Sequence, residues 1–195
     1  MKKKFILASR SPRRLRLLRS IVPKDRIVVI ESQIEEKSEP GEDAETFSKK
    51  VAARKAAAVW QNYAGDRSTI AAVIGADTVI WFENRIIGQP KDKVDAIRIL
   101  MELRGKFHEV VTSVAVLKVS CQCMEVFCLR SKVWMHKSDE MTIKNYVATG
   151  EPMDKAGAYG IQERGRMLVA KYEGSYSNIV GLPTEELKRV LEDLL

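Results

Sequence analysis

Apolar and polar positions follow one another along the chain in blocks that predict alternating strands and helices. Apolar runs at "FIL" and "RIVVIES" and a longer one, "TIAAVIGADTVIWF", have the composition of strands. Leucines at helical spacing follow Pro12, and Ser11 before it is a suitable N-cap, so a helix is expected to begin there. The sequence "PGED" breaks the pattern before a second helix, predicted over residues 43–62.

The second half of the chain continues this alternation. A helix capped by Asp92 is expected to end at Gly105, and the two apolar strands after it, 108–119 and 124–135, are expected to pair as a hairpin. The remaining predicted elements are a helix from Ser138 to Gly150, a strand near "MLVAKY" and a helix from about Pro183. Strands and helices in this order predict an α/β protein with a mixed sheet.

Length and composition fit one globular unit. The chain has 195 residues, and 45% of them are hydrophobic, which is enough for a substantial core and argues against disorder. The apolar runs are too short to span a membrane, and "MKKKFILASRSP" reaches arginine and proline before a signal-peptide core develops. Three cysteines do not suggest a disulfide framework, and Cys121 and Cys123 lack the spacing of a zinc site, so reduced thiols in the cytoplasm are expected.

The positive charge is concentrated at one end of the chain. Residues 1–60 carry 15 lysines and arginines against 8 acidic residues, while residues 61–195 carry 18 of each. Arg13 and Arg14 lie in the first turn of the predicted helix, where the helix dipole disfavours cations unless an anion joins them. With Ser9 and Ser11 they form either a phosphate cradle or a solvated basic face.

Two more side chains are unusual for their predicted positions. Asp77 is the only charge within "AAVIGADTVIWF", and a carboxylate on a buried strand has to be paired or bound to a cation. It is either a strand-end aspartate bonded to nearby backbone or part of a site. Lys55 falls on the apolar stripe of the helix over 43–62 and either extends to solvent or contacts an anion. Cations beside a buried base are what hydrolysis of a polyphosphate requires.

Five separated blocks then carry a resemblance to a known family. The blocks "LASRSPRR", "GADTV", "GQP…AIRILMELRGKFHEVVTSVAV", "GEPMDKAGAYGIQ" and "GSYSNIVGLP" resemble the signature blocks of the Maf family of nucleoside triphosphate pyrophosphatases, in the family's order from residue 5 to residue 183. The resemblance implies one Maf-like domain over residues 1–195 with an ITPase-like (Maf/HAM1) α/β fold, in which a long curved mixed sheet and two lobes enclose a cleft. It also implies a divalent cation, magnesium or manganese, and a homodimer.

The resemblance assigns roles by matching position. Asp77 takes the place of the general base that activates water against the α-phosphorus, and Lys55 that of a lysine contacting the phosphates. Glu36 matches an acidic residue near the metal and the water, with Glu35 as the register alternative. The metal would be held by Asp77 and Glu36. The phosphate-binding loop is matched by Ser9, Arg13 and Arg14.

One position departs from the family pattern. The family usually has lysine before the proline in the block that here contains Gln89. An amide can donate a hydrogen bond to phosphate but brings no charge to the developing pyrophosphate, and Lys91 is a candidate substitute. In the block "DKAG", Asp154 and Lys155 either form a structural ion pair or line the cleft.

Three matched positions bear on substrate choice. Arg13, Thr78 and Gln162 are the set of the dTTP and UTP branch, whereas the branch resembling 7-methyl-GTP pyrophosphatases has tyrosine, glutamine and glutamate there. A glutamine amide can donate to O4 of uracil or thymine and accept from N3–H. A neighbour must fix the orientation of that amide, and Thr78 is the matched candidate.

We therefore expect an enzyme that releases pyrophosphate from dTTP and UTP. Two alternatives stay open, namely a 7-methyl-GTP pyrophosphatase and a nucleic-acid or cell-division-machinery binding protein with a weakly active cleft. Convergence of Arg13, Arg14 and Lys55 on Asp77 would favour catalysis, whereas a continuous basic stripe outside the cleft would favour binding. We expect the chain to bind a nucleoside triphosphate and to bind neither a membrane nor nucleic acid.

Overall fold

The computed structural model describes residues 2–39 and 41–195, and it has the expected α/β architecture with a mixed sheet. Pro40, part of the break predicted at "PGED", lies outside the described residues. The strands are β1 (Lys4–Ala8), β2 (Ile27–Val29), β3 (Ile70–Phe82), β4 (Arg85–Ile87), β5 (Phe107–Lys118), β6 (Cys123–Met135) and β7 (Val169–Glu173). The α-helices are α1 (Pro12–Leu18), α2 (Ala44–Gln61), α3 (Lys93–Leu103), α4 (Glu140–Ala148), α5 (Tyr176–Val180) and α6 (Thr184–Val190).

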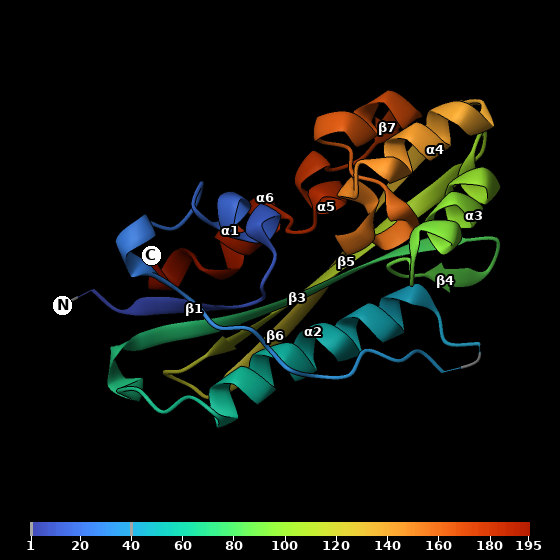
Figure 1. Ribbon diagram of the computed structural model, residues 1–195. Coiled ribbons are helices and arrows are strands. Elements are labelled where there is room, and N and C mark those ends of the chain that lie inside the picture. Colours follow the sequence, from blue (N-terminus) through green and yellow to red (C-terminus); the bar gives the residue numbers. More distant parts are fainter. Residues whose placement is uncertain (1, 40) are drawn as a thin grey trace.

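The sheet is built around three long strands. Its order is β2-β1-β3-β5-β6-β7, with β4 also pairing with β3. β1 is parallel to β2 and β3, while β3, β5, β6 and β7 are successively antiparallel. In Figure 1, α1, α6 and both termini lie beside one end of the long strands, and α3 and α4 lie beside the other end. This division agrees with the expected two lobes.

One edge of β3 is left open in its middle. On this edge β1 pairs with β3 as far as Gly75, and β4 begins to pair at Ile80. On the other edge β5 pairs continuously from Ala72 to Trp81. The short stretch between the ends of β1 and β4, which contains Asp77 and Thr78, is therefore free to border a cleft.

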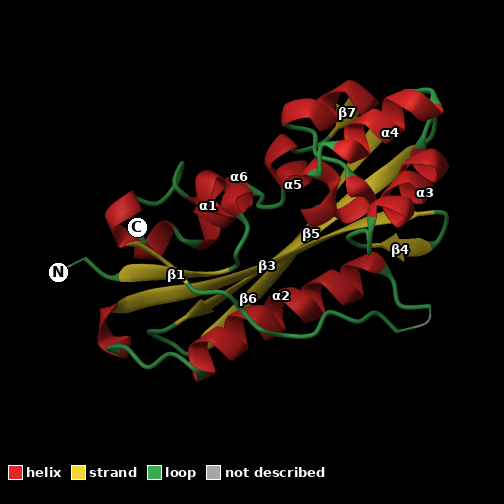
Figure 2. Cartoon of the chain, viewed as in Figure 1, coloured by secondary structure: helices red, strands yellow, loops and turns green. Residues whose placement is uncertain are grey.

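Helices cover both faces of the sheet. α2 runs along one face, and the other helices lie on the opposite face (Figure 2). Successive β3 side chains point to opposite faces, so Ile74 packs in the cluster with Leu18 and Leu187, while Val73 packs with Ala52 and Ala56 of α2. Gly75 allows this close approach, because a Cβ there would lie against the backbone of Ala52 and Ala56.

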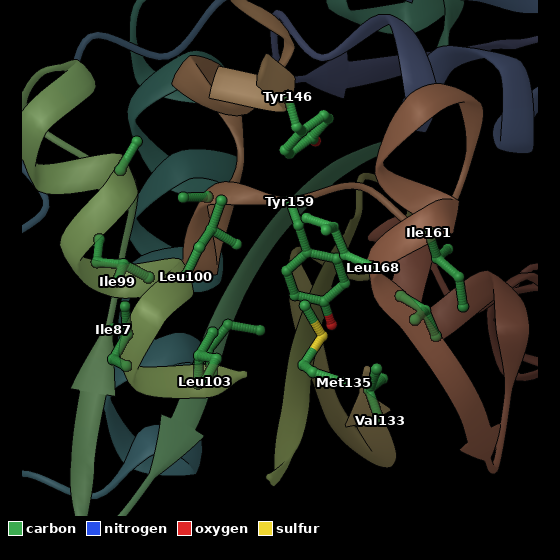
Figure 3. Close-up of a cluster of buried hydrophobic side chains, with 14 of the residues drawn as sticks. Ile87, Ile99, Leu100, Leu103, Val133, Met135, Tyr146, Tyr159, Ile161 and Leu168 are labelled. Carbon is green, nitrogen blue, oxygen red and sulfur yellow. The ribbon is translucent and has the colours of Figure 1, made fainter. Parts of the chain in front are cut away.

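A separate cluster fills the lobe that contains α3 and α4. Figure 3 shows Tyr159 at its centre, with Leu100 of α3 to one side and Ile161 to the other. Tyr159 is 5% exposed, and its hydroxyl lies 2.7 Å from Nε2 of buried His108, a contact that fits a structural role for this histidine. The loop 156–165 is thereby anchored to the core.

Several local predictions were wrong. The N-cap of α4 is Asp139 rather than Ser138, because its carboxylate accepts a hydrogen bond from the Thr142 backbone nitrogen at 2.7 Å. The strand predicted at "RIVVIES" ends at Val29 as an edge strand, and the short helix α5 was not anticipated. Cys121 and Cys123 were expected to be reduced, but they form a disulfide in the β5–β6 turn, while Cys128 is free.

No helix among the described residues is long and apolar enough to cross a membrane.

Candidate active site

A cleft of about 880 Å³ opens at the uncovered stretch of β3. Its volume lies within the range usual for small-molecule sites. All nine residues selected from the sequence line it, together with Asp154 and Lys155. These nine are Ser9, Arg13, Arg14, Glu36, Lys55, Asp77, Thr78, Gln89 and Gln162.

Arg14 is held in place by a network of hydrogen bonds. Its guanidinium donates to the Gly181 carbonyl at 2.9 Å, to Ser9 Oγ at 3.3 Å and to Thr78 Oγ1 at 3.0 Å. Thr112 donates its single hydroxyl proton to the Asn178 carbonyl, so in the 3.0 Å contact with Thr112 the donor is Thr78. Burial lowers the pKa of Arg14, while the nearby carboxylates of Asp77 and Glu36 act in the opposite direction. The side chain is therefore a positioned cation in the cleft wall.

Lys55 links two carboxylates from distant segments. Its Nζ lies 2.9 Å from Asp77 Oδ1 and 2.7 Å from Glu36 Oε1. Asp77 is only 3% exposed and Lys55 is 6% exposed, so both are shielded from solvent. Lys55, on the apolar stripe of α2, therefore contacts anions rather than extending to solvent. Asp77 is in turn paired with the Lys55 ammonium.

Of the two candidate acidic residues, only Glu36 lies in the cleft. Glu36 lines the cleft, whereas Glu35 is 69% exposed and pairs with Lys37. A group of three or more metal-ligating side chains does not occur within residues 2–39 and 41–195. However, Asp77 Oδ2 is buried without a hydrogen-bond partner in this part of the chain. An unpaired carboxylate oxygen beside a second carboxylate fits a magnesium ion, which proteins often hold by one or two carboxylates and the substrate phosphates.

Arg13 reaches across the cleft to the segment after α4. Its Nη1 lies 2.7 Å from Asp154 Oδ2, and Asp154 Oδ1 is also 2.8 Å from Lys155 Nζ. Gln89 donates its side-chain amide to the Asp154 carbonyl at 3.2 Å. Asp154 and Lys155 thus both form an ion pair and line the cleft. Lys91, the expected substitute for a lysine at position 89, is exposed and not part of the lining, whereas Lys155 is.

Gln162 lies in the same cleft with an unmet acceptor. Its Oε1 is buried and has no hydrogen-bond partner among the residues described. No hydrogen bond joins Thr78 to this amide among the described residues, where the Thr78 hydroxyl accepts from Arg14 and donates to Thr112. The side chains that hold the loop around Gln162 could not be identified from the sequence, because the local sequence pattern does not distinguish them from other residues.

The chain is similar to known proteins over nearly its full length. The family model described as "Maf-like protein" matches residues 4–194. A dTTP/UTP pyrophosphatase of Dictyoglomus thermophilum is 45% identical over 194 residues, covering 100% of this chain and 97% of its own. One of Aquifex aeolicus is 40% identical over 193 residues, with 98% and 95% covered.

Two solved structures are also similar, at low sequence identity. A nucleoside-triphosphatase (dITP/XTP pyrophosphatase) of Mycobacterium abscessus has a TM-score of 0.47 and 16% identity, with 98% of this chain and 97% of that chain covered. A HAM1 protein of Coxiella burnetii has a TM-score of 0.49 and 14% identity, with 98% and 99% covered. Because these scores are low, the assignment rests on the family match and on relatives that share two-fifths or more of their residues over nearly the full length. By that measure the chain belongs to the Maf family.

Proposed function

We propose that this chain hydrolyses dTTP and UTP to the nucleoside monophosphate and pyrophosphate, the activity for which its relatives are named. One observation carries the proposal. Arg13 and Arg14 of α1 and Lys55 of α2 line the same cleft as the Asp77 carboxylate of β3. Three cations around a buried carboxylate suit a polyanion that is to be attacked by water.

The cations would bind the triphosphate. Arg14 is already oriented by Gly181, Ser9 and Thr78, so little side-chain entropy is lost when it binds a phosphate oxygen. Lys55 offsets part of the negative charge of Asp77 and Glu36 where the phosphates would approach, which reduces the repulsion between these carboxylates and the phosphates. Gln89 would donate a neutral hydrogen bond, and Lys155 offers a charge near it.

Asp77 would act as the general base. Its Oδ1 is held by Lys55, which leaves Oδ2 to take a proton from a water molecule. The water oxygen would form a bond to the α-phosphorus as the bond from this phosphorus to the α–β bridging oxygen breaks. The products are the nucleoside monophosphate and pyrophosphate, and the proton taken by Asp77 returns to solvent.

Asp77 and Glu36 would also hold a divalent cation, magnesium or manganese. When bound, the ion would supply positive charge that offsets the charge of the phosphate oxygens. Both carboxylates contact Lys55 Nζ, so the lysine would keep them together before the ion binds.

Gln162 would read the pyrimidine base. Its amide can donate to O4 and accept from N3–H, and cytosine reverses this order of donor and acceptor. The combination of Arg13, Thr78 and Gln162 in one cleft supports the dTTP and UTP branch over 7-methyl-GTP.

Pyrophosphate release from dTTP, UTP, CTP and 7-methyl-GTP with magnesium tests the proposal. We expect dTTP and UTP to have the highest kcat/KM. A preference for 7-methyl-GTP would overturn the branch assignment. Absence of turnover with all four nucleotides, combined with tight binding of nucleic acid, would favour the binding-protein alternative.

The homodimer and the single domain over residues 1–195 stay predictions from the family resemblance, and the cytoplasmic location stays a prediction from the sequence. Analytical ultracentrifugation of the purified chain tests the dimer. A sedimenting mass of about twice the 22.0 kDa of one chain is expected.

A further inference from the structure

The residue that orients Gln162 has to be sought outside the set suggested by the sequence. Thr78 is hydrogen-bonded to Arg14 and Thr112 rather than to Gln162, and the Gln162 amide oxygen has no partner in the described part of the chain. The position of this amide therefore depends on the backbone of the segment that carries it, residues 160–165. We call these six residues the base segment.

The two ends of the base segment are tied to two side chains that contact each other. At its start, the Gly160 backbone nitrogen donates to the Tyr146 hydroxyl at 3.3 Å. At its end, the backbone nitrogens of Arg164 and Gly165 donate to Glu151 Oε2 at 3.2 Å and Oε1 at 3.0 Å. Tyr146 donates its hydroxyl to Glu151 Oε1 at 3.1 Å, which closes the ring of contacts.

The fit around these contacts is tight. A Cβ on Gly165 would lie 2.7 Å from the Tyr146 hydroxyl and 2.8 Å from the Gly160 backbone nitrogen. Only glycine therefore lets the two ends of the base segment approach each other here. Within the segment Glu163, directly after Gln162, has a φ of +55°, an uncommon conformation that surrounding contacts must maintain.

The two anchoring side chains differ in what they supply. Tyr146 belongs to α4 and is 2% exposed in the cluster of Figure 3, so it connects the base segment to the packed core. Burial and the nearby Glu151 carboxylate raise the pKa of Tyr146, which keeps its hydroxyl protonated as a donor. Glu151 supplies a negative charge, and hydrogen bonds from backbone N–H groups to a carboxylate are stronger than neutral ones.

We propose that Glu151, through its contacts with the backbone of the base segment and with Tyr146, is the positioning residue that sets the selectivity of Gln162 for uracil and thymine. The proposal rests on the proposed function, in which Gln162 reads the base. Glu151 does not line the cleft and acts only through the segment.

Glu151→Gln is the variant that tests this role. It keeps the shape of the side chain but removes its charge and turns one acceptor oxygen into an NH2 group facing a backbone N–H. The matched control is Glu140→Gln, the same change at an exposed residue of α4 that pairs only with Lys144 among the described residues. We expect the ratio of kcat/KM for UTP to that for CTP to fall about tenfold in Glu151→Gln, through KM rather than kcat, and to stay unchanged in the control.

A double-variant cycle separates positioning from a general loss of structure. If Glu151 acts through Gln162, Glu151→Gln should not change the UTP:CTP ratio further once Gln162 is alanine. Equal losses for UTP and CTP in Glu151→Gln, or a further drop of the ratio in the Gln162→Ala background, would overturn the proposal. If Glu151→Gln fails to fold, Tyr146→Phe removes the contact at the other end of the segment and should lower the same ratio.

Amide hydrogen exchange distinguishes this proposal from the proposed function. Residues 160–165 should exchange faster in Glu151→Gln than in wild type or Glu140→Gln, whether or not the protein hydrolyses UTP. Unchanged exchange there would overturn the positioning role. A Gln162→Ala variant that keeps the wild-type UTP:CTP ratio would overturn base reading, and with it the role of Glu151 in selectivity, even if exchange increases.

Discussion

Asp77 and Thr78 are adjacent on β3, yet they serve different halves of the cleft. Because side chains alternate along a strand, Asp77 points to Lys55 of α2, while Thr78 points to Arg14 of α1. One dipeptide thus places a carboxylate beside the candidate metal site and a hydroxyl beside Arg14, the arginine proposed to bind phosphate. A shift of one residue along β3 would exchange the two.

Replacing the Asp77 carboxylate should affect chemistry far more than folding. Asp77→Asn keeps the shape but removes the proton acceptor, and loss of a general base typically costs about 10²- to 10⁴-fold in rate. Lys55 keeps its ion pair with Glu36, so its charge is not left unpaired. Steady-state kcat with dTTP and the thermal midpoint test this, and turnover near the wild-type value would contradict the assignment.

Arg13 and Arg14 should differ in their effects on stability. Arg13 pairs with Asp154, which is 56% exposed, and exposed pairs contribute about 0–1 kcal/mol. Arg14 donates to three partners inside the cleft wall, and each hydrogen bond of a charged group contributes about 1.5–3 kcal/mol. Chemical denaturation should therefore show a clear loss of unfolding free energy for Arg14→Gln and little for Arg13→Gln.

Both variants should raise the KM for dTTP. A clear loss of stability in Arg13→Gln with an unchanged KM would show that Arg13 is structural rather than a phosphate ligand.

At the scale of elements, the site depends on how closely α2 approaches β3. The approach is set at Gly75, two residues before Asp77, where α2 backbone atoms occupy the space a side chain would need. Lys55 lies on this face of α2, so the same contact that packs the helix also brings its ammonium to the carboxylate. Packing and electrostatics are coupled through one glycine.

Gly75→Ala should therefore reduce both stability and activity. The added methyl group would clash with backbone atoms of Ala52 and Ala56, and overpacking of this kind costs about 1–3 kcal/mol. Displacement of α2 would also lengthen the contact between Lys55 and Asp77, which should lower kcat/KM. Gly88→Ala is the control for thermal stability, because a Cβ there meets no atom within 4 Å. Equal thermal midpoints for the two variants would contradict this account.

At the scale of the whole molecule, the cleft lies between two lobes that share the long strands. Buried groups on these strands therefore report on global unfolding. His108 on β5 is 1% exposed, and burial lowers its pKa from 6.5 to about 3. The folded protein keeps this imidazole neutral, whereas the unfolded chain binds a proton below pH 6.5. The stability that depends on neutral His108 is present above pH 6.5 and is lost progressively down to about pH 3.

The unfolding free energy should fall by about 2 kcal/mol from this group between pH 7.5 and pH 5, at about 1.4 kcal/mol per pKa unit. In His108→Gln the side chain at position 108 does not titrate. The fall in unfolding free energy between the two pH values should therefore be smaller than in wild type by this same amount. Urea denaturation at the two pH values measures the difference. Parallel pH profiles for the variant and wild type would show that His108 titrates normally in the folded state.

Local signals in the sequence determined most elements, and with the family blocks they selected residues that line the cleft. The helix predicted over 43–62 is α2 at Ala44–Gln61, and the strand predicted over 69–82 is β3 at Ile70–Phe82, because periodicity and capping depend on residues close in the chain. The misfit of Asp77 and Lys55 with apolar surroundings indicated a site, and the basic helix start added Ser9. The family blocks supplied Glu36, Thr78, Gln89 and Gln162. All of these residues line the cleft.

Only the tertiary structure decided which side chains contact one another. Asp154 meets Arg13 from 141 residues away, and Thr78 meets Arg14 from 64 residues away. Glu151 is tied to the end of the base segment by bonds to backbone nitrogens. Every residue except proline carries a backbone N–H. A hydrogen bond from such a group therefore does not require a particular residue type at the donating position, and the sequence does not reveal it. Side-chain type and spacing can therefore select the residues of the cleft, but its hydrogen bonds follow from how the sheet and α2 bring distant segments together.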